Sequence, residues 1–267
     1  MELLEDDSAT DRYKINVLDR AVRILKAFNA GTSHMSLQQI TASTRLPKST
    51  VFRILSALSE HGLIMRDTDS GDFALGYEIL MLAEVARESS GLAGWAMPII
   101  TEISDRLQET VVINVRSGDF RIPTVQVIGK QSTRRSASIG QPKPLYAGAA
   151  GKVFLAGMSD HELDDYLGRT ELVKVGHHTI TDADLLRQEI EEIRRIGYAV
   201  GVGEIGESEI AGVSAAIQGR MGVTVGALTI TVPAERFDPE LRGRLIDAVV
   251  GGAERVGANL RRHRTGK

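Results

Sequence analysis

Three observations predict an α+β protein with two folded domains. Residues 14–76 hold three helical segments, each apolar on one side, followed by two short strands around a polar turn. Residues 92–267 alternate β-branched runs with helical segments, as antiparallel sheets flanked by helices do. The length of 267 residues suits two domains of ordinary size.

The composition is that of a globular protein, with 42% hydrophobic and 25% charged residues and a net charge of -3. The sequence has no cysteine, which excludes disulfides, thiolate metal sites and a cysteine nucleophile and favours the cytoplasm. No apolar run approaches the roughly 20 residues that a membrane span requires, so we expect no membrane contact. The acidic start predicts a mobile arm over residues 1–13.

Charge is unevenly distributed along the chain. Residues 1–11 hold five acidic and no basic side chains, whereas residues 12–76 hold nine basic and five acidic ones, a net charge of +4. A locally basic segment in an acidic chain is expected when only one module meets phosphates.

Apolar spacing and a cap indicate the first two helices. Apolar residues recur at helical spacing over 17–28, which predicts a helix that ends near Asn29. Ser36 and Gln39 have the spacing of a capping box, which predicts a short helix from there to about Ser43.

A third helix is predicted from Pro47, because proline suits a first helical turn, to Gly62. Its apolar stripe follows the i, i+3, i+4, i+7 spacing: Val51, Ile54, Leu55 and Leu58. The opposite face has residue types that meet bases and phosphates from a major groove, although a solvated helix face explains them equally well: Lys48, Ser49, Phe52, Arg53 and Ser56. Two strands at 63–66 and 73–75 complete a winged helix.

Three segments of this domain resemble, in order, the signatures of the IclR-type DNA-binding domain: VLDRAVRIL at 17–25, LPKSTVFRILSAL at 46–58 and FALG at 73–76. The resemblance implies a winged helix-turn-helix over 14–76 whose third helix contacts DNA through four residues: Lys48, Ser49, Thr50 and Arg53. Arg45 in the turn and Arg66 on the wing are expected phosphate contacts, which position the protein without reading sequence. Ser36 is a further DNA-contact candidate.

Residues 77–91 predict a linker helix whose apolar side is wider than a lone surface helix needs. We expect it to pack against a second copy of the chain, in a dimer or a pair of dimers.

The second domain, residues 92–267, is expected to start with a helix over 95–107 and a strand pair at 111–115 and 124–128. A capping box at Ser159 and a cap at Thr181 predict two further helices, the second ending at Gly197. Three strands and a last helix complete the expected elements: 198–202, 211–217, 223–232 and 238–260.

The segment LYAGAAGK at 145–152 is rich in small residues and leads into a helix, so its amides could bind a carboxylate. Close packing of that helix on a sheet explains the small residues as well. The segment is not a phosphate loop, because it lacks the Walker spacing and has no Ser or Thr after Lys152.

This segment, together with the later Gly-Tyr-Ala at 197–199, an acidic residue and a strand bearing Ser or Thr, also resembles the IclR pattern. The resemblance implies a GAF/PAS-like effector domain whose pocket binds a small acid through these residues: Gly148, Ala149, Ala150, Glu204, Ser214, Thr229 and Thr231. The glycine-rich stretch 201–207 leaves the register of Glu204 open. Alternation along the strand predicts that Ser214 faces the same way as Gly212 and Ala216.

Two other groups of side chains are considered and set aside. His177 and His178 lie near Asp182 and Asp184, but adjacent histidines cannot easily turn to one ion, so we expect no metal. Catalysis would draw on residues that form no nucleophile elbow or Ser-x-x-Lys pattern: Ser136, Ser138, Lys152 and His161. We expect no cofactor and no enzyme activity.

The resemblance implies a cytoplasmic transcriptional regulator that binds a near-palindromic operator in double-stranded DNA and represses a catabolic pathway, under the control of a small organic or aromatic acid. Two alternatives stay open. The winged helix could serve protein contact beside a domain that binds a metabolite or acts as an enzyme, or the regulator could be constitutive, with a vestigial pocket. DNA retention at two salt concentrations tests the first alternative, and an acid screen tests the second.

Overall fold

The structure, a computed structural model of the chain, describes residues 16–29, 32–132, 136–206 and 209–263. It divides into two units, one up to Ser89 and the other from Ser90. The arm expected over residues 1–13 lies outside the described residues. Within the part described, no helix is both long and apolar enough to cross a membrane.

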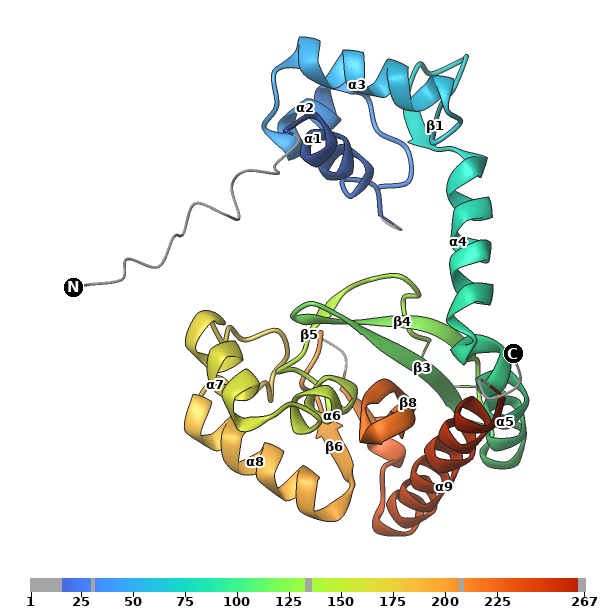
Figure 1. Cartoon of the computed structure of the whole chain (residues 1–267), viewed down its shortest axis with the longest axis vertical. Helices are drawn as coiled ribbons and strands as arrows, with labels where there is room; N and C mark the ends of the chain where they lie inside the picture. Colours follow the sequence, from blue (N-terminus) through green and yellow to red (C-terminus); the bar gives the residue numbers. More distant parts are fainter. Residues whose placement is uncertain (1–15, 30–31, 133–135, 207–208, 264–267) are drawn as a thin grey trace, which may run out of the picture. The chain divides into compact units, whose positions relative to one another are not determined.

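The first unit is a helical bundle with a hairpin (Figure 1), and its described elements follow in chain order: α1 (Asn16–Leu25), α2 (Leu37–Thr44), α3 (Lys48–Glu60), β1 (Ile64–Arg66), β2 (Phe73–Leu75) and α4 (Tyr77–Ser90). β1 and β2 pair antiparallel, with Ile64 opposite Leu75. The predicted winged helix is confirmed.

The core of this unit forms between the apolar faces of α1, α2 and α3, and four of its side chains are fully buried: Ile24, Ile40, Val51 and Leu55. The periodicity over 17–28 overestimates the first helix, which ends at Leu25. The chain turns there, and Asn29 pairs with Thr32 in a short bridge. Phe28 lies in this turn and is still buried in the core. Its apolar side chain falls at helical spacing, which is why the periodicity predicted a longer helix.

The second unit is built around one sheet. Its described elements begin with α5 (Leu92–Leu107), β3 (Thr110–Ser117), β4 (Phe120–Val127), β5 (Lys143–Pro144), α6 (Ala149–Ala156), α7 (Asp160–Arg169) and α8 (Ala183–Ile196). They continue with β6 (Tyr198–Val202), β7 (Ile210–Gln218), the short 3-10 turn η2 (Arg220–Gly222), the strand β8 (Thr224–Pro233), the short 3-10 turn η3 (Ala234–Arg236) and the helix α9 (Pro239–His263). The strand order is β5-β4-β3-β8-β7-β6, with antiparallel neighbours throughout. The predicted α+β class is confirmed.

Helices cover both faces of this sheet. α5 and α9 pack on one face, against alternate residues of β7 such as Val213 and Ala215. α6 and α8 belong to a second core, which includes Ala216 of the same strand. Because strand side chains alternate between faces, Gly212 and Ser214 lie on the α6 side with Ala216, as predicted.

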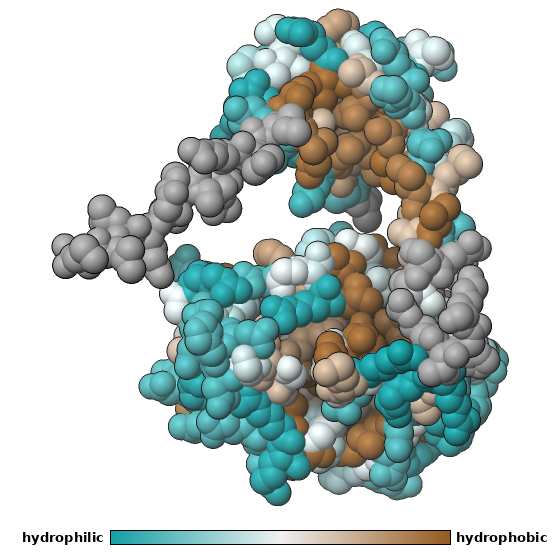
Figure 2. All heavy atoms as spheres, viewed as in Figure 1, coloured by the Kyte–Doolittle hydropathy of each residue, from teal (hydrophilic) through white to brown (hydrophobic). Residues whose placement is uncertain are grey.

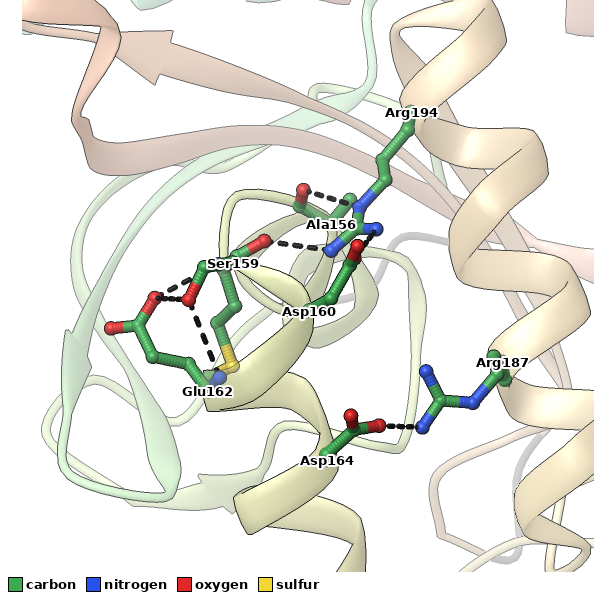
Figure 3. Close-up of polar contacts among 8 residues, drawn as sticks. Ala156, Ser159, Asp160, Glu162, Asp164, Arg187 and Arg194 are labelled. Atoms are coloured by element: carbon green, nitrogen blue, oxygen red, sulfur yellow. Dashed lines mark hydrogen bonds and ion pairs between the residues drawn. The ribbon is translucent and has the colours of Figure 1, made fainter.

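Helices α7 and α8 hold the end of α6 in place (Figure 3). The guanidinium of Arg194 on α8 donates to Ala156 O at 3.1 Å, to Met158 O at 2.7 Å and to Asp160 Oδ1 at 2.6 Å. One side chain thus satisfies carbonyls that the end of α6 leaves free. The predicted capping box of α7 is present, since Ser159 Oγ accepts from Glu162 N.

The predicted cap of α8 was wrong by one residue. Asp182, and not Thr181, is the N-cap: its Oδ1 accepts from Asp184 N and from Leu185 N, both at 2.9 Å. A carboxylate can satisfy two free amides at the positive end of a helix, where one threonine hydroxyl satisfies fewer. The predicted end at Gly197 is correct, with a left-handed φ of 84°.

Candidate functional site

The outer face of α3 is the first candidate site. Lys48, Ser49, Phe52 and Arg53 are exposed on it, while Thr50 is half-buried. Pro47 precedes this helix and makes no side-chain cap hydrogen bond to the amides of its first turn. Free amides at a helix start attract anions such as phosphate. The structure thus gathers hydroxyls, two cations and an anion-attracting helix end on one face.

The other three candidates in this unit lie around α3 and already have structural contacts or strained backbone. Ser36 Oγ accepts from Gln39 N at 3.3 Å, and Gln39 Oε1 accepts from Ser36 N at 2.8 Å, so the predicted capping box engages Ser36. Arg45 is exposed in the turn before α3, with a left-handed φ of 54°.

The Arg66 side chain contacts the wing, the hairpin of β1 and β2 to which it belongs. Its Nε donates to Gly71 O at 3.2 Å, and its guanidinium lies 5.5 Å from the centre of the Phe73 ring. The wing turn is further held by Asp67, whose carboxylate accepts from Ser70 N and Asp69 N, and these hydrogen bonds lower the pKa of Asp67. Arg66 is thus both an exposed cation and a brace of the hairpin.

The second candidate site is a cavity of about 230 Å³ in the second unit, on the α6 side of the sheet. Its walls come from β3, β4, β5, the start of α6 and the strands β7 and β8, and the lining residues are Val112, Asn114, Arg121, Pro123, Ser136, Ala137, Ser138, Lys143, Gly148, Ala149, Ala150, Gly201, Glu204, Ile205, Ile210, Gly212, Thr229 and Thr231.

Six of the seven predicted ligand residues line this cavity: Gly148, Ala149, Ala150, Glu204, Thr229 and Thr231. Ser214 does not, because its side chain is fully buried behind the wall. Its Oγ donates to Leu228 O at 3.0 Å and lies 2.9 Å from Thr229 Oγ1. In this structure Ser214 therefore supports Thr229 and has no surface on the cavity.

The register of Glu204, left open by the sequence, puts its carboxylate at the start of α6. Gly148 N donates to Glu204 Oε2 at 2.9 Å, and Lys152 Nζ donates to Oε1 at 2.6 Å. Lys152 is fully buried and also pairs with Glu189. The helix end that was expected to attract an acid is thus already next to a carboxylate of the chain itself.

Glycines allow the Glu204 carboxylate to lie close to the start of α6. A Cβ on Gly201 would lie 2.9 Å from Glu204 Oε1 and 3.0 Å from Ala149 N, and Gly148 has a left-handed φ of 77°. A Cβ on Gly151 would lie 2.2 Å from Leu145 O. The close packing expected of the small residues in 145–152 is thus present, and the start of α6 also lines the cavity, while binding of a carboxylate by its amides stays a prediction.

Sequence reasoning missed Asn114, Arg121 and Lys143 in the cavity wall. Arg121 Nη1 donates to Asn114 Oδ1 at 2.8 Å, and Asn114 Nδ2 donates to Thr229 Oγ1 at 3.1 Å. Burial lowers the pKa of Arg121 to about 10, so the side chain is still charged at neutral pH. One signal was available: Asn114 is polar within the otherwise apolar Val111–Val115 run, and it is buried.

The histidine pair gives no support to a metal site. His177 and His178 are exposed, and the described residues contain no group of three or more His, Cys, Asp or Glu side chains that could hold a metal ion. His178 Nε2 lies 3.8 Å from Glu209 Oε1, and both side chains are solvent-exposed.

Both units match known protein families. Residues 17–68 match the IclR helix-turn-helix domain, and residues 86–258 match the C-terminal domain of the bacterial transcriptional regulator IclR. The HTH-type transcriptional regulator Rv1719 of Mycobacterium tuberculosis is 33% identical over 249 residues, which cover 90% of this chain and 94% of that protein. The HTH-type transcriptional repressor AllR of Escherichia coli is 26% identical over 223 residues, covering 82% of this chain and 81% of that protein.

A solved structure extends the comparison to the fold. An IclR homologue from Microbacterium hydrocarbonoxydans, complexed with 4-hydroxybenzoate, has a TM-score of 0.80 at 23% identity, covering 91% of this chain and 98% of that one. The family models account for both units in the order that the sequence signatures predicted. The chain therefore belongs to the IclR family of bacterial transcriptional regulators, which join a DNA-binding helix-turn-helix to an effector domain.

Proposed function

We propose that this regulator is a cytoplasmic, non-enzymatic repressor of catabolic genes, and that a small organic or aromatic acid in its effector domain controls it. The observation that carries the proposal is the cavity of about 230 Å³, which lies at the start of α6 and is lined by both polar and apolar residues. Its volume is below the roughly 300–1,000 Å³ of drug-sized sites, which favours a small ligand. The name of the relative AllR supports repression.

On the DNA side, Lys48, Ser49, Thr50 and Arg53 are proposed to contact the operator from the major groove. Lys48, Ser49 and Arg53 share the exposed face of α3, which supports this role. Arg45, Arg66 and Ser36 are proposed to contact phosphates or the DNA backbone beside that helix. Two copies of α3 in a dimer would read half-sites about 34–36 Å apart on a near-palindromic operator.

On the effector side, the acid is proposed to occupy the space between the start of α6 and strand β8. Gly148, Ala149, Ala150 and Glu204 would form one wall, and Thr229 and Thr231 the other, with Ser214 acting through Thr229. The acid changes DNA binding only as far as its affinity differs between the DNA-bound and released arrangements.

Retention on DNA tests the regulatory role. The full-length protein is passed over its own promoter fragment and over random DNA at two salt concentrations. Specific retention, weakening on both DNAs as salt rises, is the expected result, because phosphate contacts release counterions. Equal retention on both fragments would leave the winged helix without a specific operator and would overturn the proposal.

A thermal-shift screen of small carboxylic and aromatic acids tests the effector. At a concentration 100 times its dissociation constant, an acid that binds only the folded chain is expected to stabilise it by about 2.7 kcal/mol. The neutral amide of each acid serves as the matched control. If no acid in the panel raised the unfolding temperature above that control, acid control would be refuted and the constitutive alternative favoured.

Helix α4 supports the proposed homo-oligomer. Tyr77, Leu80, Met81 and Val85 are each more than 60% exposed and form one helical stripe, and Figure 2 shows apolar side chains along this helix. Changing Leu80 and Val85 to glutamate is expected to weaken self-association by about 100-fold or more, because each apolar side chain buried in an interface contributes roughly 1.5–3 kcal/mol. Light scattering on a sizing column measures the mass.

The control for this experiment is Met221→Glu, which makes the same chemical change at a side chain that is 99% exposed on a turn of the second unit. It should leave the mass unchanged. A wild-type monomer at micromolar concentration, or an undiminished oligomer in the Leu80→Glu, Val85→Glu variant, would contradict the role of α4.

A further inference from the structure

Arg121 is a half-buried cation that forms no ion pair in the part of the chain the structure describes. Its Nη1 donates to the neutral amide oxygen of Asn114, and burial alone accounts for the lowering of its pKa. Among the described residues its Nε is buried with no hydrogen-bond partner, and the same is true of the Oγ1 of Thr231, another residue that lines the cavity. Buried polar atoms without partners are rare and call for a specific explanation.

A second cation stands beside it. Lys143 on β5 is the direct cross-strand neighbour of Arg121 on β4, and both side chains line the cavity. Like charges directly opposite each other on paired strands are destabilising. An anion bound at both would turn this repulsion into attraction.

The remaining charged group of the cavity wall, Glu204, already has partners within the chain. Glu204 accepts from Lys152 Nζ and from Gly148 N at the start of α6. Its carboxylate opposes a second anion at that helix end. The cationic lining residues for which the described part of the chain offers no ion pair are therefore Arg121 on β4 and Lys143 on β5.

One edge of the Arg121 guanidinium has no hydrogen bond within the described residues. Nε and Nη2 form one side of the fork, and Nη1 is the atom held by Asn114. Elsewhere in this chain, Arg169 uses its Nε and Nη2 to bind both oxygens of Asp119, at 3.2 and 2.6 Å. Two parallel hydrogen bonds of this kind are a preferred way to bind a carboxylate.

We propose that Arg121, with Lys143 beside it, binds the carboxylate of the effector. This inference rests on the proposed function of the cavity as the effector site. The hydroxyl of Thr231 provides a further polar contact. The bound carboxylate would lie near the start of α6, because a Cβ on Gly148 would be 3.7 Å from Arg121 Nη2. The ligand class is a small carboxylate with an uncharged body.

The experiment compares benzoate with the uncharged, equally shaped benzamide, and pyruvate with pyruvamide, in the full-length protein by calorimetry and thermal shift. Sodium chloride keeps the ionic strength equal. Arg121→Met removes the charge and keeps an apolar stem, and Lys143→Met changes the half-buried neighbour. A urea titration verifies that each variant is folded.

At least one acid is expected to bind the wild type in preference to its amide. In Arg121→Met its affinity should fall roughly 10- to 100-fold, the loss of one or two charge-assisted hydrogen bonds, and the preference for acid over amide should disappear. Lys143→Met should reduce the same preference by a smaller factor. If Arg121→Met did not fold, this loss of preference in Lys143→Met would carry the test.

Two results would overturn the inference, and they differ. Equal binding of the acid by the wild type and both variants would place the carboxylate elsewhere, such as at the amides of Ala149 and Ala150, and would leave the proposed function intact. Failure of every acid to bind the wild type would remove the acid effector itself, and with it this inference.

Discussion

Replacing Lys152 with methionine is expected to lower the free energy of unfolding of the effector unit by about 3–5 kcal/mol. The Lys152 side chain is 1% exposed and its Nζ lies 2.6 Å from Glu204 Oε1, whose side chain is 8% exposed. Removing the ammonium leaves that carboxylate charged in a site with little access to water. The measurement is a urea titration followed by the fluorescence of Trp95, the only tryptophan of the chain, which lies in this unit.

Two controls distinguish the cost of leaving the Glu204 carboxylate without its cation from the cost of lost packing around Lys152. Adding Glu204→Gln to Lys152→Met should restore about half of the loss, because the amide oxygen still accepts from Gly148 N and carries no charge. Arg255→Met breaks a pair with Glu102 in which both side chains are 51% exposed, and it should cost less than about 1 kcal/mol. An unchanged urea midpoint in Lys152→Met would show that the ion pair adds nothing.

Replacing Arg53 with alanine is expected to weaken binding to the operator by about 10- to 100-fold, which corresponds to 1–3 kcal/mol for a lost base contact. Ser49→Ala should have an effect of the same kind. Both side chains are exposed on α3, so neither change opens a cavity in the core formed by the other face. Fluorescence anisotropy with the promoter fragment and with random DNA, at one salt concentration, gives the two affinities.

Arg66→Ala is the contrasting variant. A phosphate contact carries no sequence information, so its loss should weaken binding to both DNAs alike and lower the slope of affinity against salt by about 1. Since Arg66 also braces its wing through Gly71 O, the variant needs a check of folding. If all three variants lost the same factor on operator and random DNA, the division into reading and positioning residues would be incorrect.

The sequence predicted elements whose causes are local. The stripe of α3 and the caps at Ser36 and Ser159 depend on residues within a few positions of one another, and they are present in the structure. The failures are also local: Thr181 and Asp182 are both good cap residues, and only the backbone decides which one sits at the helix start.

The cavity was only partly predictable. The resemblance pointed to Gly148–Ala150 and to Thr229 and Thr231, which do line it. The pair between Lys152 and Glu204 joins residues far apart in the chain, and periodicity contains no information on such a contact. Arg121 was harder still, because what distinguishes it is that no described carboxylate forms an ion pair with it.

The hydrogen bonds that join Arg121, Asn114, Thr229 and Ser214 all run in one direction. Ser214 has a single hydroxyl hydrogen and gives it to Leu228 O, so Thr229 must give its own hydrogen to Ser214. Asn114 in turn donates to Thr229 and accepts from Arg121. Every dipole of this row therefore points away from Arg121, across β4, β3, β8 and β7. Because aligned hydrogen bonds polarise one another, an anion bound at Arg121 would strengthen hydrogen bonds on all four strands.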